Sequence, residues 1–344
     1  MNKSFTFIAI GLVVLCGCES KQSRMQQLLL KGNIASKDRN WQQALRYYEQ
    51  ATQMNDCFAD AWNNAGTVYF EQKRYEQALA SYDKALTCDP HFLNALINRA
   101  NTTYQLKEYY RSIDDLQKVI VARPDTAIAY FALGLSYTRL RDFAKALQVF
   151  SKAKQIAGND AKMKQELLVN HAIVYYYLHH YDSAQTELQQ AARLNDREPN
   201  IYNTLSLIEV ELKHYTEALN LVNEAIRLDP HQSYYVNNRG YIYLLQNELS
   251  KAEVDIDESI SKDPDNAWAY RNKGIYYLMK EDYPSAERLL KQALKMDSFV
   301  DKIHFYMGMA YLKNGKKELA CQSFAKSKQA EDLLLTPDLL RNCK

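Results

Sequence analysis

The sequence contains few of the residues that make turns. Its 344 residues include 10 glycines and 7 prolines, whereas average proteins have about 7% glycine and about 5% proline. This shortage excludes a collagen, a β-sandwich with many turns and a low-complexity tail. We therefore expect long regular segments joined by short connections, and helix is the favoured type.

A charge imbalance is also missing. The chain has 43 Lys and Arg against 41 Asp and Glu, a net charge of +2, and no long block of one sign. A nucleic-acid-binding surface needs clustered positive charge, so no nucleic-acid partner is predicted. Hydrophobic residues make up 47% and charged residues 24% of the chain, as in globular proteins. The length permits two domains or one continuous repeat array.

Sequence motifs for catalysis are absent as well. The seven histidines are dispersed, and the sequence has no H-E-x-x-H, no G-x-S-x-G and no glycine-rich phosphate loop. The repeats described below occupy nearly all of the mature chain and leave no room for a catalytic domain. We predict that the protein is not an enzyme and uses no cofactor and no metal.

Four cysteines lie beyond the N-terminal segment: Cys57, Cys88, Cys321 and Cys343. They have no C-x-x-C spacing and no clustered histidine, so a zinc site is not predicted. Free, half-buried thiols are the expectation. An exported chain would permit disulfides, and Cys57–Cys88 and Cys321–Cys343 are then the pairings to test.

Residues 1–17 have the pattern of an export signal. An apolar run of 11 residues, 5–15, follows one positive charge, and it is too short to span a bilayer, which takes about 20 apolar residues. The sequence Leu15-Cys16-Gly17-Cys18 resembles the lipobox of bacterial lipoproteins, which implies that Cys18 is lipidated and begins the mature chain. An ordinary signal peptide and an uncleaved anchor are the alternatives. Glu19 favours the outer membrane, with the periplasmic side as the expected location.

A period of 34 residues organises the rest of the chain. In the unit 59–92 the recurring residues are Trp62, Gly66, Tyr69, Tyr75, Ala78, Tyr82, Ala85 and Pro90, at unit positions 4, 8, 11, 17, 20, 24, 27 and 32. This pattern resembles the tetratricopeptide repeat (TPR) nearly letter for letter. The frame starts at residues 25, 59, 93 and 127, shifts by four residues, and resumes at 165, 199, 233, 267 and 301. Nine repeats thus fill residues 25–334.

The resemblance implies an all-α fold, a superhelix of helix-turn-helix repeats with a concave face. Position 8 holds Gly, Ala or Ser, and position 20 holds Ala or Ser, in all nine repeats. Two helices approach closely where neither carries a bulky side chain, so helix A and helix B of each repeat should cross there. The shift near residues 158–161 is a lengthened turn or a helix extension. Residues 18–24 form a linker, and the tail 335–344 is a short cap or a partner-binding end.

In the TPR family, helix A lines the groove with the side chains at positions 2, 5, 6, 9 and 12. Asparagines recur at positions 5 and 6, and an amide offers both a donor and an acceptor to a peptide group. The row resembles the asparagine ladder of O-linked N-acetylglucosamine transferases, which implies that it holds an extended chain by its backbone. The alternative is that these asparagines only support the neighbouring helix. Aromatic anchors are concentrated in repeats seven to nine. The predicted partner-binding residues are Asn64, Asn98, Asn101, Tyr104, Phe131, Asn170, Tyr176, Tyr234, Asn237, Asn238, Tyr241, Trp268, Arg271, Asn272, Phe305 and Tyr306.

Together these patterns predict a membrane-tethered TPR scaffold that binds a protein or an extended peptide segment of an envelope complex. The six residues between Cys18 and the array reach roughly 20 Å at full extension, which keeps the repeats close to the bilayer. Lipoproteins of this build include pilotins for secretins and adaptors for peptidoglycan hydrolases. A carbohydrate- or peptidoglycan-binding protein and a self-assembling homo-oligomer are the alternatives.

Overall fold

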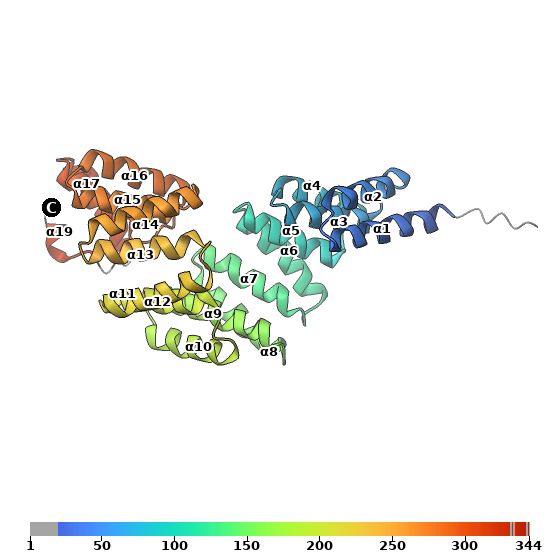
Figure 1. Ribbon diagram of the computed structural model, residues 1–344, viewed down its shortest axis with the longest axis horizontal. Helices are drawn as coiled ribbons and strands as arrows, with labels where there is room; N and C mark the ends of the chain where they lie inside the picture. Colours follow the sequence, from blue (N-terminus) through green and yellow to red (C-terminus); the bar gives the residue numbers. More distant parts are fainter. Residues whose placement is uncertain (1–19, 331, 333, 342, 344) are drawn as a thin grey trace, which may run out of the picture. The chain divides into compact units, whose positions relative to one another are not determined.

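The computed structural model describes residues 20–330, 332, 334–341 and 343, and these contain helices and no strand (Figure 1). The predicted signal peptide and Cys18 lie outside the described residues. The all-α prediction is confirmed. The chain divides into two compact units, which we call unit 1 (residues 1–156) and unit 2 (residues 157–344).

Unit 1 contains repeats one to four, each an antiparallel pair of helices. The pairs are α1 (Lys21–Lys37) with α2 (Trp41–Met54), α3 (Ala59–Glu71) with α4 (Tyr75–Cys88), α5 (Leu93–Gln105) with α6 (Tyr109–Ala122), and α7 (Ala127–Arg139) with α8 (Phe143–Ile156).

Unit 2 contains repeats five to nine and a short last helix. The pairs are α9 (Ala161–Tyr177) with α10 (Tyr181–Leu194), α11 (Pro199–Glu211) with α12 (Tyr215–Leu228), α13 (Ser233–Leu245) with α14 (Leu249–Lys262), α15 (Ala267–Met279) with α16 (Tyr283–Met296), and α17 (Ile303–Lys313) with α18 (Lys317–Gln329); α19 (Pro337–Arg341) follows.

The small residues at positions 8 and 20 allow helix A and helix B to pack closely, as predicted. A β-carbon added to Gly66 would lie 2.6 Å from the ring of Tyr82, and one added to Gly134 would lie 2.4 Å from the ring of Phe150. These rings belong to position 24 and are buried. The position-8 glycine therefore provides the space for the largest core side chain of its own repeat.

The turn between helix A and helix B is the same in all nine repeats, and it explains why glycine is rare. The residue at position 15 has a positive φ in each repeat, from Arg39 at 56° to Gly315 at 74°. In repeat one, the Asn40 N–H donates to the Ala35 carbonyl at 2.8 Å, which is the Schellman pattern of a helix end. Glycine is the usual residue there, but eight of these nine positions hold Lys, Arg, His, Asn or Glu.

The four-residue shift is an extension of a helix. Helix α8 ends at Ile156, and α9 begins at Ala161 and runs for 17 residues, whereas α11 has 13. The Asp160 carboxylate caps α9 by accepting a hydrogen bond from the Met163 N–H at 3.0 Å. The insertion thus adds one turn to helix A of repeat five, at the boundary between the two units.

The expectation of free thiols was wrong. Cys57 is joined to Cys88, and Cys321 to Cys343, with Cα atoms 5.1 Å and 5.4 Å apart. The second disulfide attaches the tail to α18, and Leu334, Leu335 and Leu339 pack against the core of unit 2. The tail packs there as a short cap on repeat nine.

Removing the tail disulfide is expected to destabilise unit 2 alone. In the double variant Cys321→Ser/Cys343→Ser, opening a loop of 22 residues should lower the free energy of unfolding by about 3 kcal/mol. Denaturant unfolding followed by the emission of Trp268 reports unit 2. The matched variant Cys57→Ser/Cys88→Ser should change only the transition reported by Trp41 and Trp62 in unit 1. If unit 2 of the oxidised native chain and unit 2 of Cys321→Ser/Cys343→Ser unfold at the same denaturant concentration, the prediction is wrong.

Repeats eight and nine are joined through the carboxylate of Glu287. It accepts hydrogen bonds from Lys291 and Lys316, each at 2.7 Å, and from Asn314 at 3.1 Å. Burial raises the pKa of this carboxyl, but the three hydrogen bonds outweigh it and bring the pKa from 4.5 to about 2.

A pH dependence follows from the low pKa of Glu287. Because the pKa falls on folding, the carboxylate stabilises the native state above pH 4.5, and this contribution is lost as the pH falls from 4.5 to about 2. We expect the urea midpoint of unit 2 to fall less steeply across this window in Glu287→Gln than in the native chain. If the urea midpoint falls with pH equally steeply in the two proteins, Glu287 is not the group that causes this pH dependence.

Candidate functional site

The A helices form a continuous inner layer in each unit. Helix A of each repeat contacts helix A of the next, and helix B packs between consecutive A helices. We call the side chains at positions 2, 5, 6, 9 and 12 of the A helices the inner face. The inner face of each unit is described separately, because the two differ.

In unit 1, side-chain amides form a hydrogen-bonded chain across three repeats. The Asn98 amide donates to Asn63 at 3.0 Å, Asn63 donates to Asn64 at 3.0 Å, and Asn64 donates to Asn33 at 2.8 Å. The Tyr48 hydroxyl also donates to Asn33, at 2.8 Å. Asn64 and Asn98 are half-buried. The amides thus connect neighbouring repeats while part of each predicted residue stays accessible.

The amide row continues into unit 2 with a structural role. Asn238 donates to Asn203 at 2.7 Å, and Asn272 donates to Asn237 at 2.8 Å. Asn170 donates to the Glu166 carbonyl of its own helix, at 2.8 Å. Asn237 and Asn272 are fully buried. Of the two predicted interpretations of the row, support of the neighbouring helix is the one that these contacts favour.

The aromatic side chains of the unit 1 inner face remain partly exposed. Tyr104 packs edge-on against Tyr109, with ring centroids 5.5 Å apart, and its hydroxyl accepts a hydrogen bond from Arg139 at 2.9 Å. Phe131 lies 6.0 Å from Phe150 between ring centroids. Tyr104, Phe131 and the amide of Asn101 are all half-buried. These side chains are fixed by their neighbours and still offer surface to a partner.

In unit 2 the inner face is closed by contacts between distant repeats. The Lys302 ammonium and the Glu211 carboxylate pair at 2.6 Å, and their side chains are only 11% and 12% exposed. This contact joins repeat nine to repeat six. The hydroxyls of Tyr241 and Tyr306 lie 3.2 Å apart and join repeats seven and nine.

Arg271 completes this interior cluster. Its guanidinium lies over the ring of Tyr241, 4.8 Å from the centroid, and donates to the Asp301 carbonyl at 2.9 Å and to the Asn272 side chain. Burial raises the pKa of Tyr241 to about 12, although the nearby Arg271 charge opposes this shift. The tyrosine therefore stays neutral and can donate its proton to a hydrogen bond.

The structure corrects part of the predicted binding surface. Five of the residues expected to form the open groove are buried: Asn237, Tyr241, Arg271, Asn272 and Tyr306. They were expected to face a partner, but they pack against other repeats. Tyr176 and Phe305 are half-buried among aromatic neighbours. Tyr234 is 39% exposed and packs edge-on against the half-buried Trp268, with ring centroids 6.3 Å apart.

The ion pair that closes unit 2, between Glu211 and Lys302, was missed by the sequence reasoning. Glu211 and Lys302 are 91 positions apart and occupy unlike positions of their repeats. No local spacing relates them. Only the curvature of consecutive repeats brings their charges together.

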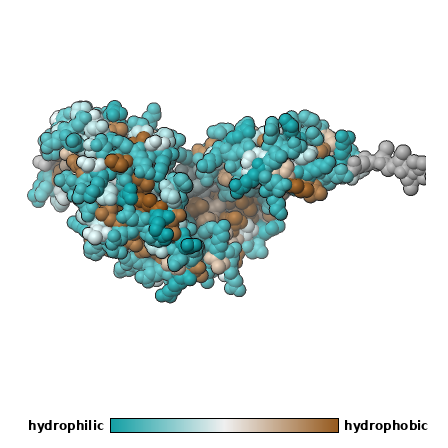
Figure 2. Space-filling view, viewed as in Figure 1, coloured by the Kyte–Doolittle hydropathy of each residue, from teal (hydrophilic) through white to brown (hydrophobic). Residues whose placement is uncertain are grey.

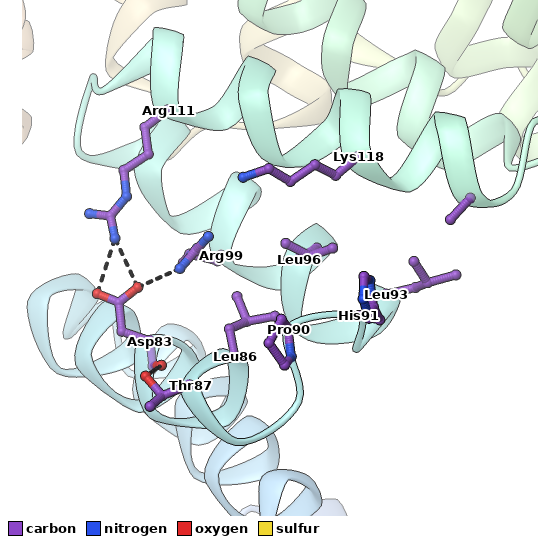
Figure 3. A pocket seen from close by; sticks show the side chains of 11 residues that line it. Asp83, Leu86, Thr87, Pro90, His91, Leu93, Leu96, Arg99, Arg111 and Lys118 are labelled. Carbon is purple, nitrogen blue, oxygen red and sulfur yellow. Dashed lines mark hydrogen bonds and ion pairs between the residues drawn. The ribbon is translucent and has the colours of Figure 1, made fainter.

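A hollow of about 630 Å³ lies between α4, α5 and α6 in unit 1. Figure 3 shows Arg99 and Arg111 pointing toward Asp83 on one side, with Leu86, Pro90 and Leu96 beside them. Arg99 donates to Asp115 through two bonds of 2.7 Å and to Asp83 at 2.7 Å. Lys118 pairs with Asp114 at 2.5 Å. Each cation of the hollow thus already has a carboxylate partner.

The described residues contain neither a metal-binding cluster nor a membrane-spanning helix. Across residues 20–330 and the described part of the tail, no three His, Cys, Asp or Glu side chains are grouped to hold a metal ion. Within the same residues, no helix has the length and apolar character needed to cross a bilayer.

Comparison with known proteins identifies the repeats. A family model described as tetratricopeptide repeat matches residues 29–91, 97–161, 169–232 and 203–267, and a second model with the same description matches residues 256–288. The matches cover more than half of the chain. The chain belongs to the tetratricopeptide repeat family. TPR proteins bind protein partners or peptides, and this TPR protein is accordingly a scaffold for protein–protein interactions.

Solved structures show the same fold. A chain from the structure of the APC/C hetero-tetramer Cut9–Hcn1 aligns with a TM-score of 0.59 and 18% identity over 88% of this chain, which spans 59% of that chain's length. The Pseudomonas aeruginosa protein pilF aligns with a TM-score of 0.51 and 18% identity, over 61% of this chain and 94% of its own. A TPR protein from Parabacteroides merdae also aligns, at a TM-score of 0.43 that is too low to support the fold by itself, with 18% identity over 83% of this chain and 98% of its own. None of the curated protein sequences matches this chain.

Proposed function

We propose that this TPR protein is a lipid-anchored scaffold of the bacterial envelope that binds an extended segment of a partner protein on the inner face of unit 1. The observation that carries the proposal is the difference between the two inner faces. In unit 1 the amides, Tyr104 and Phe131 are half-buried, whereas in unit 2 the corresponding side chains are largely occupied by one another.

The chemistry of the unit 1 face fits an uncharged, extended partner segment. Asn64, Asn98 and Asn101 present donors and acceptors that match a peptide backbone. Tyr104 and Phe131 supply large contact areas with few rotatable bonds, as is usual for binding anchors. The ordering cost on binding is small, because neighbouring side chains already hold these groups in place.

Two features support an envelope location. The N-terminal segment resembles a lipobox that ends at Cys18. Both pairs of cysteines beyond the N-terminal segment are disulfide-bonded, and disulfides persist in oxidising compartments such as the bacterial periplasm. We propose an outer-membrane lipoprotein whose repeats lie on the periplasmic side.

Site-specific photocrosslinking in cells tests the binding face. A photoreactive phenylalanine analogue in place of Tyr104 should capture a discrete partner, whereas the same analogue at Tyr110, which lies on α6 of the same repeat and is 77% exposed, should not. The capture should weaken in Asn101→Ala/Phe131→Ala. Equal capture at both positions, or none at Tyr104, would reject the face. A fractionation experiment tests the anchor separately. We expect the Cys18→Ala variant to be lost from the membrane fraction.

A further inference from the structure

Helix α1, the first of the array, has one face that no other helix of the described residues covers. At position 10, the side chains of Val68, Ser136, Ile208 and Ile242 are at most 1% exposed. Each of them packs with side chains of the preceding repeat. Ile34 holds the same position in repeat one and is 54% exposed. The α1 face is therefore the place where a further layer would pack.

The uncovered face is apolar at its centre. Leu30, which is 60% exposed, lies four residues before Ile34, so the two side chains are neighbours on one face of the helix. Figure 2 shows brown, hydrophobic residues on the surface where Figure 1 places α1. Two adjacent exposed aliphatic side chains are unusual in a chain whose other A helices bury most of theirs.

The same helix carries positive charge only. Lys21, Arg24, Lys31 and Lys37 are exposed, and Lys21–Lys37 contains no Asp or Glu. None of the four pairs with a carboxylate among the residues that the structure describes. In the whole chain the charges nearly balance, with 43 positive and 41 negative side chains. The α1 face thus combines two aliphatic side chains with cations that pair with no carboxylate of the described residues, and such cations are attracted to an anionic lipid surface.

We infer that the α1 face, formed by Leu30 and Ile34 and flanked by Lys31 and Lys37, lies on the surface of an anionic phospholipid bilayer. The inference rests on the proposed lipid anchor. Two residues separate Cys18 from Lys21, a reach of roughly 10 Å between their Cα atoms, which is similar to the Debye length of about 8 Å at physiological ionic strength. Each cation held near an anionic surface raises the partition coefficient about fivefold. The anchor and the α1 face together orient repeat one against the bilayer.

Quenching by brominated lipids tests this contact. The lipidated full chain carrying Ile34→Trp is reconstituted into vesicles of phosphatidylethanolamine and phosphatidylglycerol with brominated acyl chains. The unsubstituted chain, with its three tryptophans, gives the baseline. We expect strong quenching of the introduced indole, and weaker quenching in vesicles of brominated phosphatidylcholine alone. Adding Lys31→Glu/Lys37→Glu should abolish the quenching, whereas Lys84→Glu/Lys152→Glu, which reverses two exposed charges elsewhere in unit 1, should leave it.

The outcomes separate this inference from the anchor. Resistance of the vesicle-bound chain to an alkaline carbonate wash reports the anchor. A chain that stays bound with an unquenched indole overturns the α1 contact and leaves the anchor standing. A chain that is washed off refutes the anchor, and quenching at excess vesicles then decides the α1 contact by itself. An unquenched indole whose emission shifts to the blue as the chain is concentrated would identify a second copy as the occupant and also overturn the inference.

Discussion

Replacing Lys302 with methionine is expected to lower the free energy of unfolding of unit 2 by about 3–5 kcal/mol. The substitution leaves the Glu211 carboxylate, which is only 12% exposed, without its partner, and an uncompensated buried charge is strongly destabilising. Burial lowers the pKa of Lys302, but the charges of Glu211 and Asp301 outweigh this and raise it above 10.5. The pair therefore stabilises the fold fully at neutral pH, and this stabilisation is lost only as the pH rises through the raised pKa of Lys302, above 10.5.

A double variant provides the control for this prediction. In Lys302→Met/Glu211→Leu both charges are replaced by apolar groups, and such replacements are often neutral or stabilising. Urea unfolding of unit 2, followed through Trp268, should show a large loss in the single variant and recovery in the double one. If the single variant unfolds at the native midpoint, the pair does not close the inner face in solution.

Replacing Phe150 with alanine is expected to destabilise unit 1 by about 3–5 kcal/mol. This ring is 1% exposed and occupies the space over Gly134, so its removal leaves a cavity as well as losing apolar burial. The transition reported by Trp41 and Trp62 should move to lower denaturant, while the Trp268 signal of unit 2 should not.

Gly134→Ala gives this prediction an internal test. In the native chain the added β-carbon would lie 2.4 Å from the Phe150 ring, so the overpacking should outweigh the gain of about 1 kcal/mol from replacing a helical glycine. In the Phe150→Ala background the same methyl group should stabilise, because it fills part of the cavity. Equal effects of Gly134→Ala in the two backgrounds would show that Gly134 and Phe150 do not interact.

The packing within each repeat could be predicted from the sequence because it depends on local spacing. Positions 8 and 20 are 12 residues apart in every repeat, so two columns of small residues indicated where helix A and helix B meet. The A–B turns were harder to predict. Lysine or arginine at a position with positive φ, as at Lys73 or Arg141, carries no glycine signal.

The inner face of unit 2 could not be predicted, because its burial depends on curvature accumulated over several repeats. Tyr241 and Tyr306 occupy positions that are accessible in an extended array. An aromatic side chain is equally suited to anchoring a binding partner and to packing in a core. Asn64 and Asn98 share position 6 of their repeats, but amides that can bind a peptide can also bind each other. The sequence alone does not determine whether each amide hydrogen-bonds to a bound peptide or to another asparagine of the chain.

The contact between repeats six and nine sets a limit on how unit 2 can change. In a linear array each repeat depends only on its neighbours, so repeats can be added or deleted singly. Deleting one of repeats seven to nine would remove Lys302 or move it away from Glu211. Unit 2 is therefore expected to fold, open and be inherited as a block of fixed repeat number, whereas unit 1 retains the freedom to gain or lose a repeat.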